Sequence, residues 1–396
     1  MIPGPGACSL ALVPAAGETA TLPLVEELRE RYPRVAVAHD WLTIPGGSEE
    51  VLLELLEMFP QAELFTSVYD PAPWPRLITE RKVHSSFLNR VPGAVEHYPK
   101  LLPLMNRAFR SFDLSGFDLV LSSSHACAKN VRAPASALHV CYCHTPMRYA
   151  WEEGFLEGEE VGRAMRLLLP PLLRRLRRTD LAGAAGPDVF VANSRHVAER
   201  IRRYYGRSAE VVNPPVDVEH FLAIEREQGD YYLAFGRVVP YKRIDLAVEA
   251  CALLGRDLKV AGDGRALAAV REHRGGDRAD LLGAVTKAER DRLIAGARAL
   301  LFPGEEDFGI VPVEAQAVGV PVIAYGVGGA GETVLDEQTG VLFQPQSATA
   351  LAGAIERFEG LSLDAEEIRA NAKRFGRERF RAELAAVIDG AAPAQA

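Results

Sequence analysis

The sequence has few cysteines and no long apolar run. Its 396 residues include five cysteines, and none of them has the spacing of a metal-binding motif. Buried thiols in a reducing cytoplasm are the expected interpretation. No stretch approaches the ~18 uninterrupted apolar residues of a membrane span. Residues 1–30 lack the basic start of a secretory signal, and we treat them as a poorly determined leader.

An excess of positive charge is also missing. The formal net charge is -8, whereas nucleic-acid binding depends on clustered Lys and Arg that neutralise phosphates. We therefore expect no nucleic-acid partner. The apolar content of 48% and the charged content of 25% are those of a globular protein. The length indicates roughly two to three domains.

Strands and helices alternate along the chain, which predicts parallel sheets covered by helices on both faces. Paired prolines in 213–217 interrupt both helix and strand, so this segment is the best domain linker. The predicted N-terminal domain is 31–216 and the predicted C-terminal domain is 217–364. Residues 365–396 are predicted to form one last helix and a disordered tail.

The stretch 301–325 reads as a strand, a loop, a helix opening around Pro312 and a second strand. Glu306 falls on the loop, and Glu314 is expected in the first turn of the helix. The free N–H groups of 308–311 are a natural place for a bound anion. Glu314 suits a ribose diol, since one carboxylate can accept from two hydroxyls. Helix capping is the alternative role for Glu314.

Cations and glycines follow other predicted strand ends. Arg237 and Lys242 project from the carboxyl end of a strand, the edge at which open α/β sheets bind ligands. Two fixed cations there would suit a diphosphate, although solvated surface cations are the alternative. Gly262 lies in a glycine turn at the same edge. Glu306 could accept from sugar hydroxyls or balance charge near a reacting carbon.

The segment 326–331 satisfies the G-x-G-x-x-G fingerprint of dinucleotide binding but lacks its context. A long helix and a later acidic residue should follow it, whereas 332–335 is barely one turn. We therefore do not expect NAD. His144 follows a predicted strand, where an isolated histidine is usually only hydrogen-bonded. We find no Ser-His-Asp, metal or P-loop arrangement.

The helical pattern 161–178 combines leucines with arginines. Such a helix can lie on an anionic membrane, or it can be a solvated helix whose leucines pack on the core. Both alternatives remain open from the sequence.

Taken together, these residues resemble the retaining nucleotide-sugar glycosyltransferases of family 4, which have the GT-B fold. The strongest segment is 306–314, which looks like the E-x7-E signature of that family, and matching segments run from 34 to 358. The segment 143–151 is similar to a subgroup that builds bacterial O-antigen and exopolysaccharide, many of them mannosyltransferases. The family often has proline after the first glutamate, and we expect this departure, Asp307, to matter little for the resemblance.

The resemblance implies two Rossmann-like domains facing a cleft, with the last helix crossing back to the first domain. In the C-terminal domain, Arg237 and Lys242 would hold the diphosphate and Glu314 the ribose. The transferred sugar would be bound by Glu306 and by the backbone of 308–310, that is Phe308, Gly309 and Ile310. Gly262 matches a further family glycine turn.

The other domain would complete the site. The resemblance implies that Gly46 and Gly47 approach the phosphates and that His144 lies beside the anomeric carbon. No metal or other cofactor is expected, because cations and a helix N-terminus neutralise the leaving diphosphate. No carboxylate nucleophile stands out, which is consistent with the same-face mechanism in which the leaving phosphate assists the acceptor.

The expected function is transfer of a hexose, with mannose as one candidate, from a GDP- or UDP-sugar to a glycan or polyprenyl-linked acceptor. The expected location is the cytoplasm, with peripheral contact at the inner face of the membrane through 161–178. The alternatives are a nucleotide-sugar epimerase or phosphorylase of the same architecture, and a non-catalytic two-domain sugar-binding protein.

Overall fold

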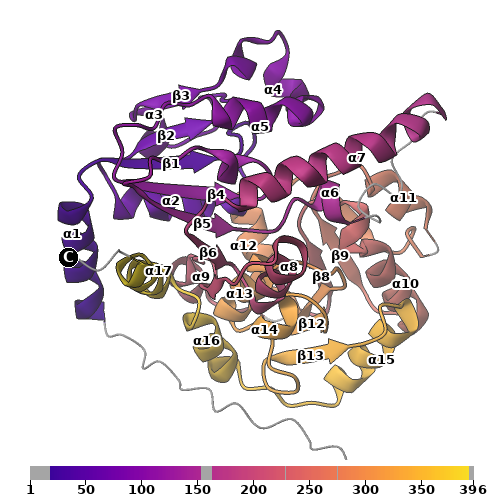
Figure 1. The fold of residues 1–396 in the computed structure, drawn as a ribbon. Coiled ribbons are helices and arrows are strands. Elements are labelled where there is room, and N and C mark those ends of the chain that lie inside the picture. The colour runs from indigo at the N-terminus through magenta and orange to yellow at the C-terminus, as the bar shows by residue number, and fades with distance from the viewer. Residues whose placement is uncertain (1–17, 153–162, 228, 274, 392–396) are drawn as a thin grey trace, which may run out of the picture.

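The computed structural model describes residues 18–152, 163–227, 229–273 and 275–391. These ranges form two α/β domains, the first in indigo to magenta and the second in orange to yellow (Figure 1). Their sheets have the strand orders β3-β2-β1-β4-β5-β6-β7 and β10-β9-β8-β11-β12-β13. Neighbouring strands are parallel throughout both sheets. The fold prediction of two Rossmann-like domains is confirmed.

The N-terminal domain takes its elements from the first half of the chain. Its strands are β1 (Val35–His39), β2 (Glu63–Thr66), β3 (Val83–Ser85), β4 (Leu119–Ser124), β5 (Leu138–Cys143), β6 (Val189–Ala192) and β7 (Glu210–Val211). Its helices are α1 (Glu18–Arg31), α2 (Ser48–Met58), α3 (Arg76–Thr79), α4 (Ala94–His97), α5 (Leu102–Arg110), α6 (Arg148–Trp151), α7 (Arg163–Ala184) and α8 (Arg195–Tyr205), with 3-10 turns η1 (Phe87–Arg90), η2 (Tyr98–Leu101) and η3 (Ala128–Asn130).

The C-terminal domain follows the proline linker. Its strands are β8 (Tyr232–Phe235), β9 (Leu258–Ala261), β10 (Asp280–Gly283), β11 (Ala299–Phe302), β12 (Val322–Tyr325) and β13 (Gly340–Phe343). Its helices are α9 (Val218–Leu222), α10 (Ile244–Leu254), α11 (Leu267–Glu272), α12 (Lys287–Ala295), α13 (Ile310–Val318), α14 (Ala330–Thr333), α15 (Ala348–Glu359) and α16 (Ala365–Lys373), with the 3-10 turn η5 (Pro240–Lys242).

The central strands explain why both sheets are parallel and covered on two faces. Every residue of β1, β4, β5 and β11 is buried, as expected for strands whose alternate side chains both enter a core. Two large apolar clusters lie against each sheet, one for each face. Because helices cover both faces of each sheet, the place open to a ligand is the edge at which the strands end.

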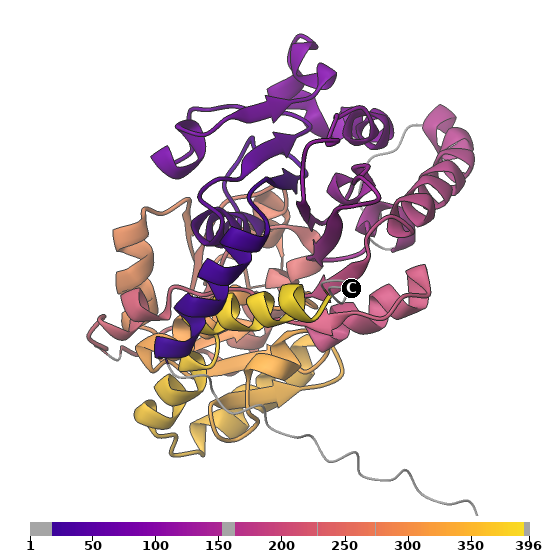
Figure 2. The ribbon, with the colours of Figure 1, turned by 60° about the vertical axis from the view of Figure 1, so that its left-hand side comes forward.

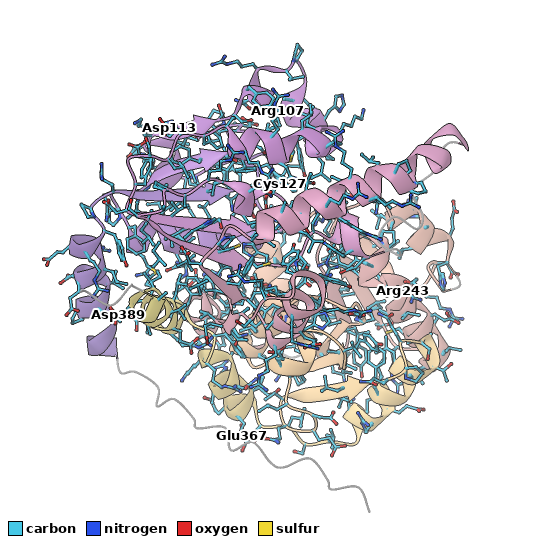
Figure 3. All side chains as sticks on the ribbon, viewed as in Figure 1. Arg107, Asp113, Cys127, Arg243, Glu367 and Asp389 are labelled. Atoms are coloured by element: carbon cyan, nitrogen blue, oxygen red, sulfur yellow. The ribbon has the colours of Figure 1, made fainter. Side chains whose placement is uncertain are left out.

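The leader prediction is wrong for residues 18–30. These residues belong to α1, which packs on α17 (Arg377–Ala391), the last described helix. Figure 2 shows the two helices side by side. Leu28 is fully buried. Arg31 pairs at 2.7 Å with Asp389, which is labelled in Figure 3. An apolar face repeated at helical spacing made this packing possible. Residues 1–17 lie outside the described residues.

The single last helix predicted over 365–386 is also wrong. The helix breaks at 374–376, and α16 stays on the C-terminal domain against α13, whereas α17 returns to the N-terminal domain. At the break, the N–H of Val216 donates to the carbonyl of Phe375 at 3.0 Å. The two chain crossings between the domains therefore lie together. The predicted tail at 392–396 lies outside the described residues.

The arginine-rich pattern forms α7, whose described side chains begin at 170. Leu172, Leu173 and Leu176 pack on the core of the N-terminal domain. For this part of the helix the contacts are those of a solvated helix packed on its own domain. Within the described ranges, no helix has both the length and the apolar content to cross a membrane.

A buried ion pair ties α7 to the rest of its domain. Lys129 and Asp180 are 2.5 Å apart, and their side chains are 1% and 0% exposed. Burial disfavours the ammonium, but the Asp180 carboxylate raises the pKa of Lys129 well above its usual value. Asp180 also accepts from the side chains of Trp151 and Tyr205. This cluster fixes the segment after β5 against α7.

We predict that Lys129→Met lowers the free energy of unfolding by about 3–5 kcal/mol, because Asp180 would be left buried without its counter-charge. Urea titration followed by circular dichroism measures the loss. The matched control is Lys82→Met, since Lys82 pairs with Glu63 at 2.9 Å on the surface, where its side chain is 66% exposed. The control should lose less than ~1 kcal/mol. Equal losses in the two variants would contradict the prediction.

Candidate active site

The loop between β11 and α13 presents free backbone N–H groups. Gly309 is the N-cap of α13 and has φ of 90°, which favours glycine. The N–H groups of Phe308, Gly309 and Ile310 have no hydrogen-bond partner among the described residues. The Phe308 side chain is buried against Phe375, so the backbone and not the ring is left for a ligand. This arrangement is suited to an anion or a sugar hydroxyl.

Lys242 and Glu306 form the charged centre of this edge. Lys242 Nζ lies 2.9 Å from Glu306 Oε1, and the side chains are 15% and 20% exposed. Burial disfavours the charged ammonium, but the Glu306 carboxylate outweighs it and raises the pKa of Lys242. Lys242 is therefore a permanent cation. The structure thus joins two residues that are 64 positions apart and that the sequence assigned to one site.

Arg237 is exposed and has no ion-pair partner among the described residues. It lies close enough for its charge to act on the hydroxyls of Tyr98 and Tyr149 in the N-terminal domain. An unpaired cation at this edge is available to a ligand phosphate.

Gly262 has a structural reason to be glycine. A Cβ there would lie 1.9 Å from the carbonyl oxygen of Gly236, and its own φ is 138°. The turn after β9 therefore packs directly on the backbone of the turn after β8, which carries Arg237. Its contribution to the site is to hold that turn in place.

The G-x-G-x-x-G segment has a structural role that the sequence did not show. Its helix, α14, has only four residues, whereas a dinucleotide fingerprint opens a long helix. The N–H of Gly329 donates to the carbonyl of Glu306 at 2.8 Å, and a Cβ on Gly329 would lie 2.2 Å from Cα of Phe308. These glycines support the β11–α13 loop from behind.

The glycine loop of the other domain meets the same helix start. A Cβ on Gly47 would lie 3.0 Å from Cδ1 of Ile310, and one on Gly46 would lie 3.1 Å from Glu49 Oε2. The loop before α2 therefore approaches α13 closely enough that larger residues would crowd it. This contact brings Gly47 beside the free N–H groups.

Glu314 lies in the second turn of α13, not the first, because the helix begins at Ile310. Its nearest cation is Arg290, whose Nη1 is 3.8 Å from Glu314 Oε1. Burial raises the pKa of Glu314 to about 7, and Glu50 of the N-terminal domain adds to the effect. The Glu314 side chain is 14% exposed, and its only ion pair among the described residues is this long one with Arg290. It has no contact with Glu306 or Lys242 among the described residues.

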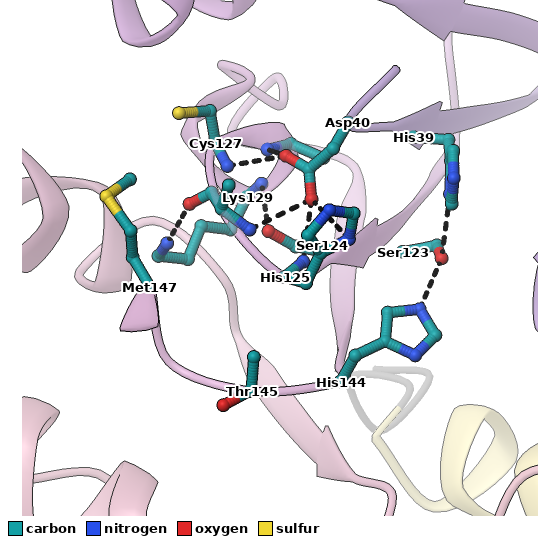
Figure 4. Close-up of polar contacts among 12 residues, drawn as sticks. His39, Asp40, Ser123, Ser124, His125, Cys127, Lys129, His144, Thr145 and Met147 are labelled. Atoms are coloured by element: carbon teal, nitrogen blue, oxygen red, sulfur yellow. Dashed lines mark hydrogen bonds and ion pairs between the residues drawn. The ribbon is translucent and has the colours of Figure 1, made fainter. Parts of the chain in front are cut away.

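His144 belongs to the N-terminal domain, in the loop after β5. Its Nε2 lies 2.8 Å from Ser123 Oγ (Figure 4). Burial lowers the pKa of His144 to about 3, so the ring is neutral at physiological pH. Asp40, which follows β1, accepts hydrogen bonds of 2.5 to 2.9 Å from the backbone N–H groups of 125–128. Asp40 therefore holds the loop after β4.

Asp307, which stands where the family often has proline, makes contacts that the sequence did not predict. Its carboxylate lies 2.7 Å from Arg148 Nη2 and 2.6 Å from Arg200 Nη1, and its carbonyl accepts from the Ser194 hydroxyl at 2.5 Å. All three partners belong to the N-terminal domain. We call Asp307, Arg148 and Arg200 the interdomain clasp. It holds the residue next to Glu306 against the opposite domain.

Glu332 adds a second connection between the domains. Its two carboxylate oxygens accept from the N–H groups of Arg195 and His196, each at 3.0 Å, at the start of α8. A carboxylate at a helix N-terminus satisfies N–H groups that lack intrahelical partners. The loop and α14 of one domain are thus fixed to α8 of the other.

The structure brings some of the predicted site residues together, whereas Glu314 lies beside Arg290 and not beside Glu306 or Lys242. Lys242 contacts Glu306, and Gly47 contacts Ile310. Sequence reasoning missed the clasp, because its members lie far apart in the chain and a single acidic residue next to Glu306 gives no signal. Within the described ranges, no group of three or more His, Cys, Asp or Glu side chains could hold a metal ion.

Residues 45–220 match the family described as Glycosyltransferase Family 4, and residues 218–377 match the one described as glycosyl transferases group 1. The two matches adjoin and cover both domains. The chain belongs to glycosyltransferase family 4. Its two facing Rossmann-like domains are the GT-B fold of that family.

Curated relatives of this family 4 chain match over part of their length. A D-inositol 3-phosphate glycosyltransferase from Geodermatophilus obscurus is 33% identical over 244 residues, which is 52% of this chain and 54% of the relative. A glycogen synthase from Mycobacterium tuberculosis is 30% identical over 216 residues, 50% of this chain and 52% of the relative. The chain spans about half the length of the curated relatives it matches.

Solved structures share the fold of the family 4 chain over nearly all of it. The Anabaena protein HepE in complex with UDP has a TM-score of 0.63 at 17% identity, covering 90% of this chain and 100% of that one. Sucrose-phosphate synthase from Thermosynechococcus elongatus has a TM-score of 0.63 at 20% identity, covering 90% and 97%. At these identities the likeness concerns the fold.

We predict that Asp307→Asn weakens the interdomain clasp, because Arg148 and Arg200 lose the charge of Asp307 across the interface and keep only Glu152 of their own domain. Small-angle X-ray scattering should show a larger radius of gyration. The matched control is Glu199→Gln, since Glu199 pairs with Arg202 at 2.5 Å within α8 alone and should leave the radius unchanged. A radius identical to that of the unsubstituted protein in the Asp307 variant would count against the clasp.

Proposed function

We propose that this protein is a retaining glycosyltransferase that moves a hexose from a nucleotide-diphosphate sugar. The observation that carries the proposal is the meeting of Lys242, Glu306 and the free N–H groups of Phe308 to Ile310 at one sheet edge. A partly buried cation and oriented N–H groups suit a diphosphate and a sugar held together. The family membership and the relatives named as glycosyltransferases support this assignment.

In this proposal the positive groups stabilise the leaving diphosphate. Lys242 stays charged because of Glu306, and Arg237 has no ion pair among the described residues to break first. Negative charge that develops on the diphosphate is then met by groups already in place, which lowers the barrier most in a partly buried site. The same groups do the work for which a metal cofactor would otherwise be needed.

The proposed reaction retains the configuration at the anomeric carbon. The bond from that carbon to the diphosphate oxygen breaks while the acceptor oxygen bonds on the same face. The acceptor proton passes to the leaving phosphate. Glu306 is engaged with Lys242 at 2.9 Å, so we assign it to sugar hydroxyls and charge balance and not to covalent attack. His144 is neutral and would act by hydrogen bonding beside the anomeric carbon.

We propose a GDP- or UDP-hexose as the donor, with GDP-mannose as a candidate. The resemblance of 143–151 to a mannosyltransferase subgroup supports mannose. The complex of Anabaena HepE with UDP supports a nucleotide diphosphate of this class. The base and the sugar are decided by the experiment below.

The acceptor is proposed to be a glycan or polyprenyl-linked saccharide that approaches along the N-terminal domain. A groove of about 510 Å³ between α5 and α7 supports this direction. Its lining includes Leu172 and four arginines that have no ion-pair partner among the described residues, namely Arg107, Arg110, Arg132 and Arg175. Unpaired arginines beside leucine suit a phosphate carried on an apolar chain. Peripheral membrane contact through the same helix is part of this proposal.

We predict that the correct nucleotide raises the melting temperature of the protein and that the others do not, since binding stabilises the folded state by mass action. A thermal-shift panel of UDP, GDP and ADP, followed by their hexoses, measures this. A ligand at 100 times its Kd should stabilise by about 2.7 kcal/mol.

Variants of the site test whether the nucleotide that stabilises the protein binds at Arg237 and Glu306. Arg237→Ala should abolish transfer and reduce the shift while the ligand-free protein melts normally. Glu306→Ala should also abolish transfer and reduce the shift, and its ligand-free protein should melt somewhat lower because Lys242 loses its partner. The matched control is Arg256→Ala, which removes an exposed arginine of the same domain paired with Glu359 at 2.7 Å and should keep both properties. Full activity in either site variant would refute the donor-site assignment.

The buried Glu314 predicts a pH dependence of donor binding. Its pKa is about 7, and only the carboxylate can accept from both ribose hydroxyls. Below pH 7 the group is increasingly neutral, so donor affinity should fall about tenfold from pH 8 to pH 6. Isothermal titration calorimetry with the stabilising nucleotide-sugar measures this. Glu314→Gln should bind weakly with a flat profile, and a profile in the variant as steep as in the unsubstituted protein would rule out Glu314 as its cause.

A further inference from the structure

Four buried side chains form a continuous hydrogen-bonded chain that ends at His144. Glu49 Oε1 lies 3.3 Å from His39 Nε2, His39 Nδ1 lies 3.0 Å from Ser123 Oγ, and Ser123 Oγ lies 2.8 Å from His144 Nε2. Figure 4 shows the last two of these bonds. The side chains of Glu49 and His39 are 7% and 0% exposed. We call these four residues the histidine relay.

The relay is built from four separate elements. His39 ends β1, Ser123 lies on β4, Glu49 is in the first turn of α2, and His144 follows β5. His39 and Ser123 are register partners in the sheet, so their side chains emerge on the same face. Because the members come from adjacent strands and a packed helix, the chain is fixed by the fold and is not a chance surface contact.

The carboxylate of Glu49, at the far end of the relay, determines which atom donates and which accepts in each hydrogen bond. The Glu49 carboxylate can only accept, and although burial opposes ionisation, the bond from His39 lowers the pKa of Glu49. His39 must therefore donate through Nε2, and a neutral ring then accepts at Nδ1. The Ser123 hydroxyl donates to that nitrogen, which leaves its oxygen to accept from Nε2–H of His144.

The other nitrogen of His144 is left as an acceptor. Within the described residues, Nδ1 of His144 has no hydrogen-bond partner, and the ring is neutral because burial lowers its pKa to about 3. A neutral ring with its proton on Nε2 has a lone pair on Nδ1. The ligand group that it recognises must then be a donor, such as a sugar hydroxyl.

We infer that Glu49, His39 and Ser123 are positioning residues that hold His144 in the Nε2–H tautomer, so that Nδ1 accepts a hydrogen bond from a hydroxyl of the transferred sugar. This inference rests on the proposed function for the identity of the ligand. The tautomer itself follows from the hydrogen bonds together with a neutral His39, because a charged His39 would donate to Ser123 and reverse the last bond. Glu49 touches no substrate in this proposal, but it affects turnover because it acts on His144 through the relay.

Nitrogen-15 NMR of the full chain labelled at histidine tests the tautomer directly. Long-range proton–nitrogen correlations at pH 7.5 distinguish the two tautomers, and the signals lost in His144→Gln assign the residue. The unsubstituted protein should show His144 protonated on Nε2. An Nδ1–H tautomer of His144 would overturn the inference, whatever the activity of the protein.

Two pairs of variants separate positioning from general damage. Ser123→Ala should let both tautomers of His144 appear and should reduce kcat about three- to tenfold, the worth of one neutral hydrogen bond. Its matched control is Ser122→Ala, because Ser122 Oγ makes the same bond to His139 Nε2 at 2.9 Å from the opposite face of β4. The control should leave His144 and kcat unchanged.

The second pair concerns the charged end. Glu49→Leu removes the acceptor and should admit the Nδ1–H tautomer of His144, whereas Glu49→Gln keeps a carbonyl acceptor and should restore the Nε2–H form. An unchanged tautomer in both Ser123→Ala and Glu49→Leu would overturn the relay. If the tautomer changes as expected but kcat does not, the relay stands and the placement of His144 at the sugar in the proposed function fails.

Discussion

The carboxylate of Asp307 holds the two domains together at the point where the donor is proposed to bind. Two arginines of the N-terminal domain neutralise it, and both have side chains that are 13% exposed or less. The Asp307 side chain is itself only 17% exposed, and a charge in such a place that loses its partners is costly, so the N-terminal domain stabilises the loop that carries Glu306. The glycines of 328–329 support the same loop from its own domain.

The two sides of the proposed site differ in their electrostatics. The C-terminal side contains ions, namely Lys242, Glu306 and the exposed Arg237. On the N-terminal side, His144 is the end of a buried hydrogen-bonded chain whose carboxylate, Glu49, lies at the far end. This division suits a ligand with a charged half and a hydroxylated half, because each half then meets groups that match it without a change of protonation.

Most local units were predictable, because each depends on neighbours in the chain. The β11–α13–β12 unit follows from an apolar run, a glycine and a second apolar run, and the failure of 326–331 as a dinucleotide fingerprint follows from the missing helix. The errors have a common cause. The leader prediction for 18–30 failed because α1 is stabilised by α17, more than 300 positions away, and the break at 374–376 is set by the bond between Val216 and Phe375.

The sequence by itself determined the two parallel sheets, the loop with Glu306 and the family, since periodicity and the spacing of two glutamates are properties of the chain. Tertiary structure alone decided the roles of Asp307, Glu49 and Glu332. Each is an acidic side chain in an ordinary context, and its importance comes from partners on other elements: two arginines, a histidine and two backbone N–H groups. A carboxylate is costly to bury without donors, and only the folded chain shows where those donors lie.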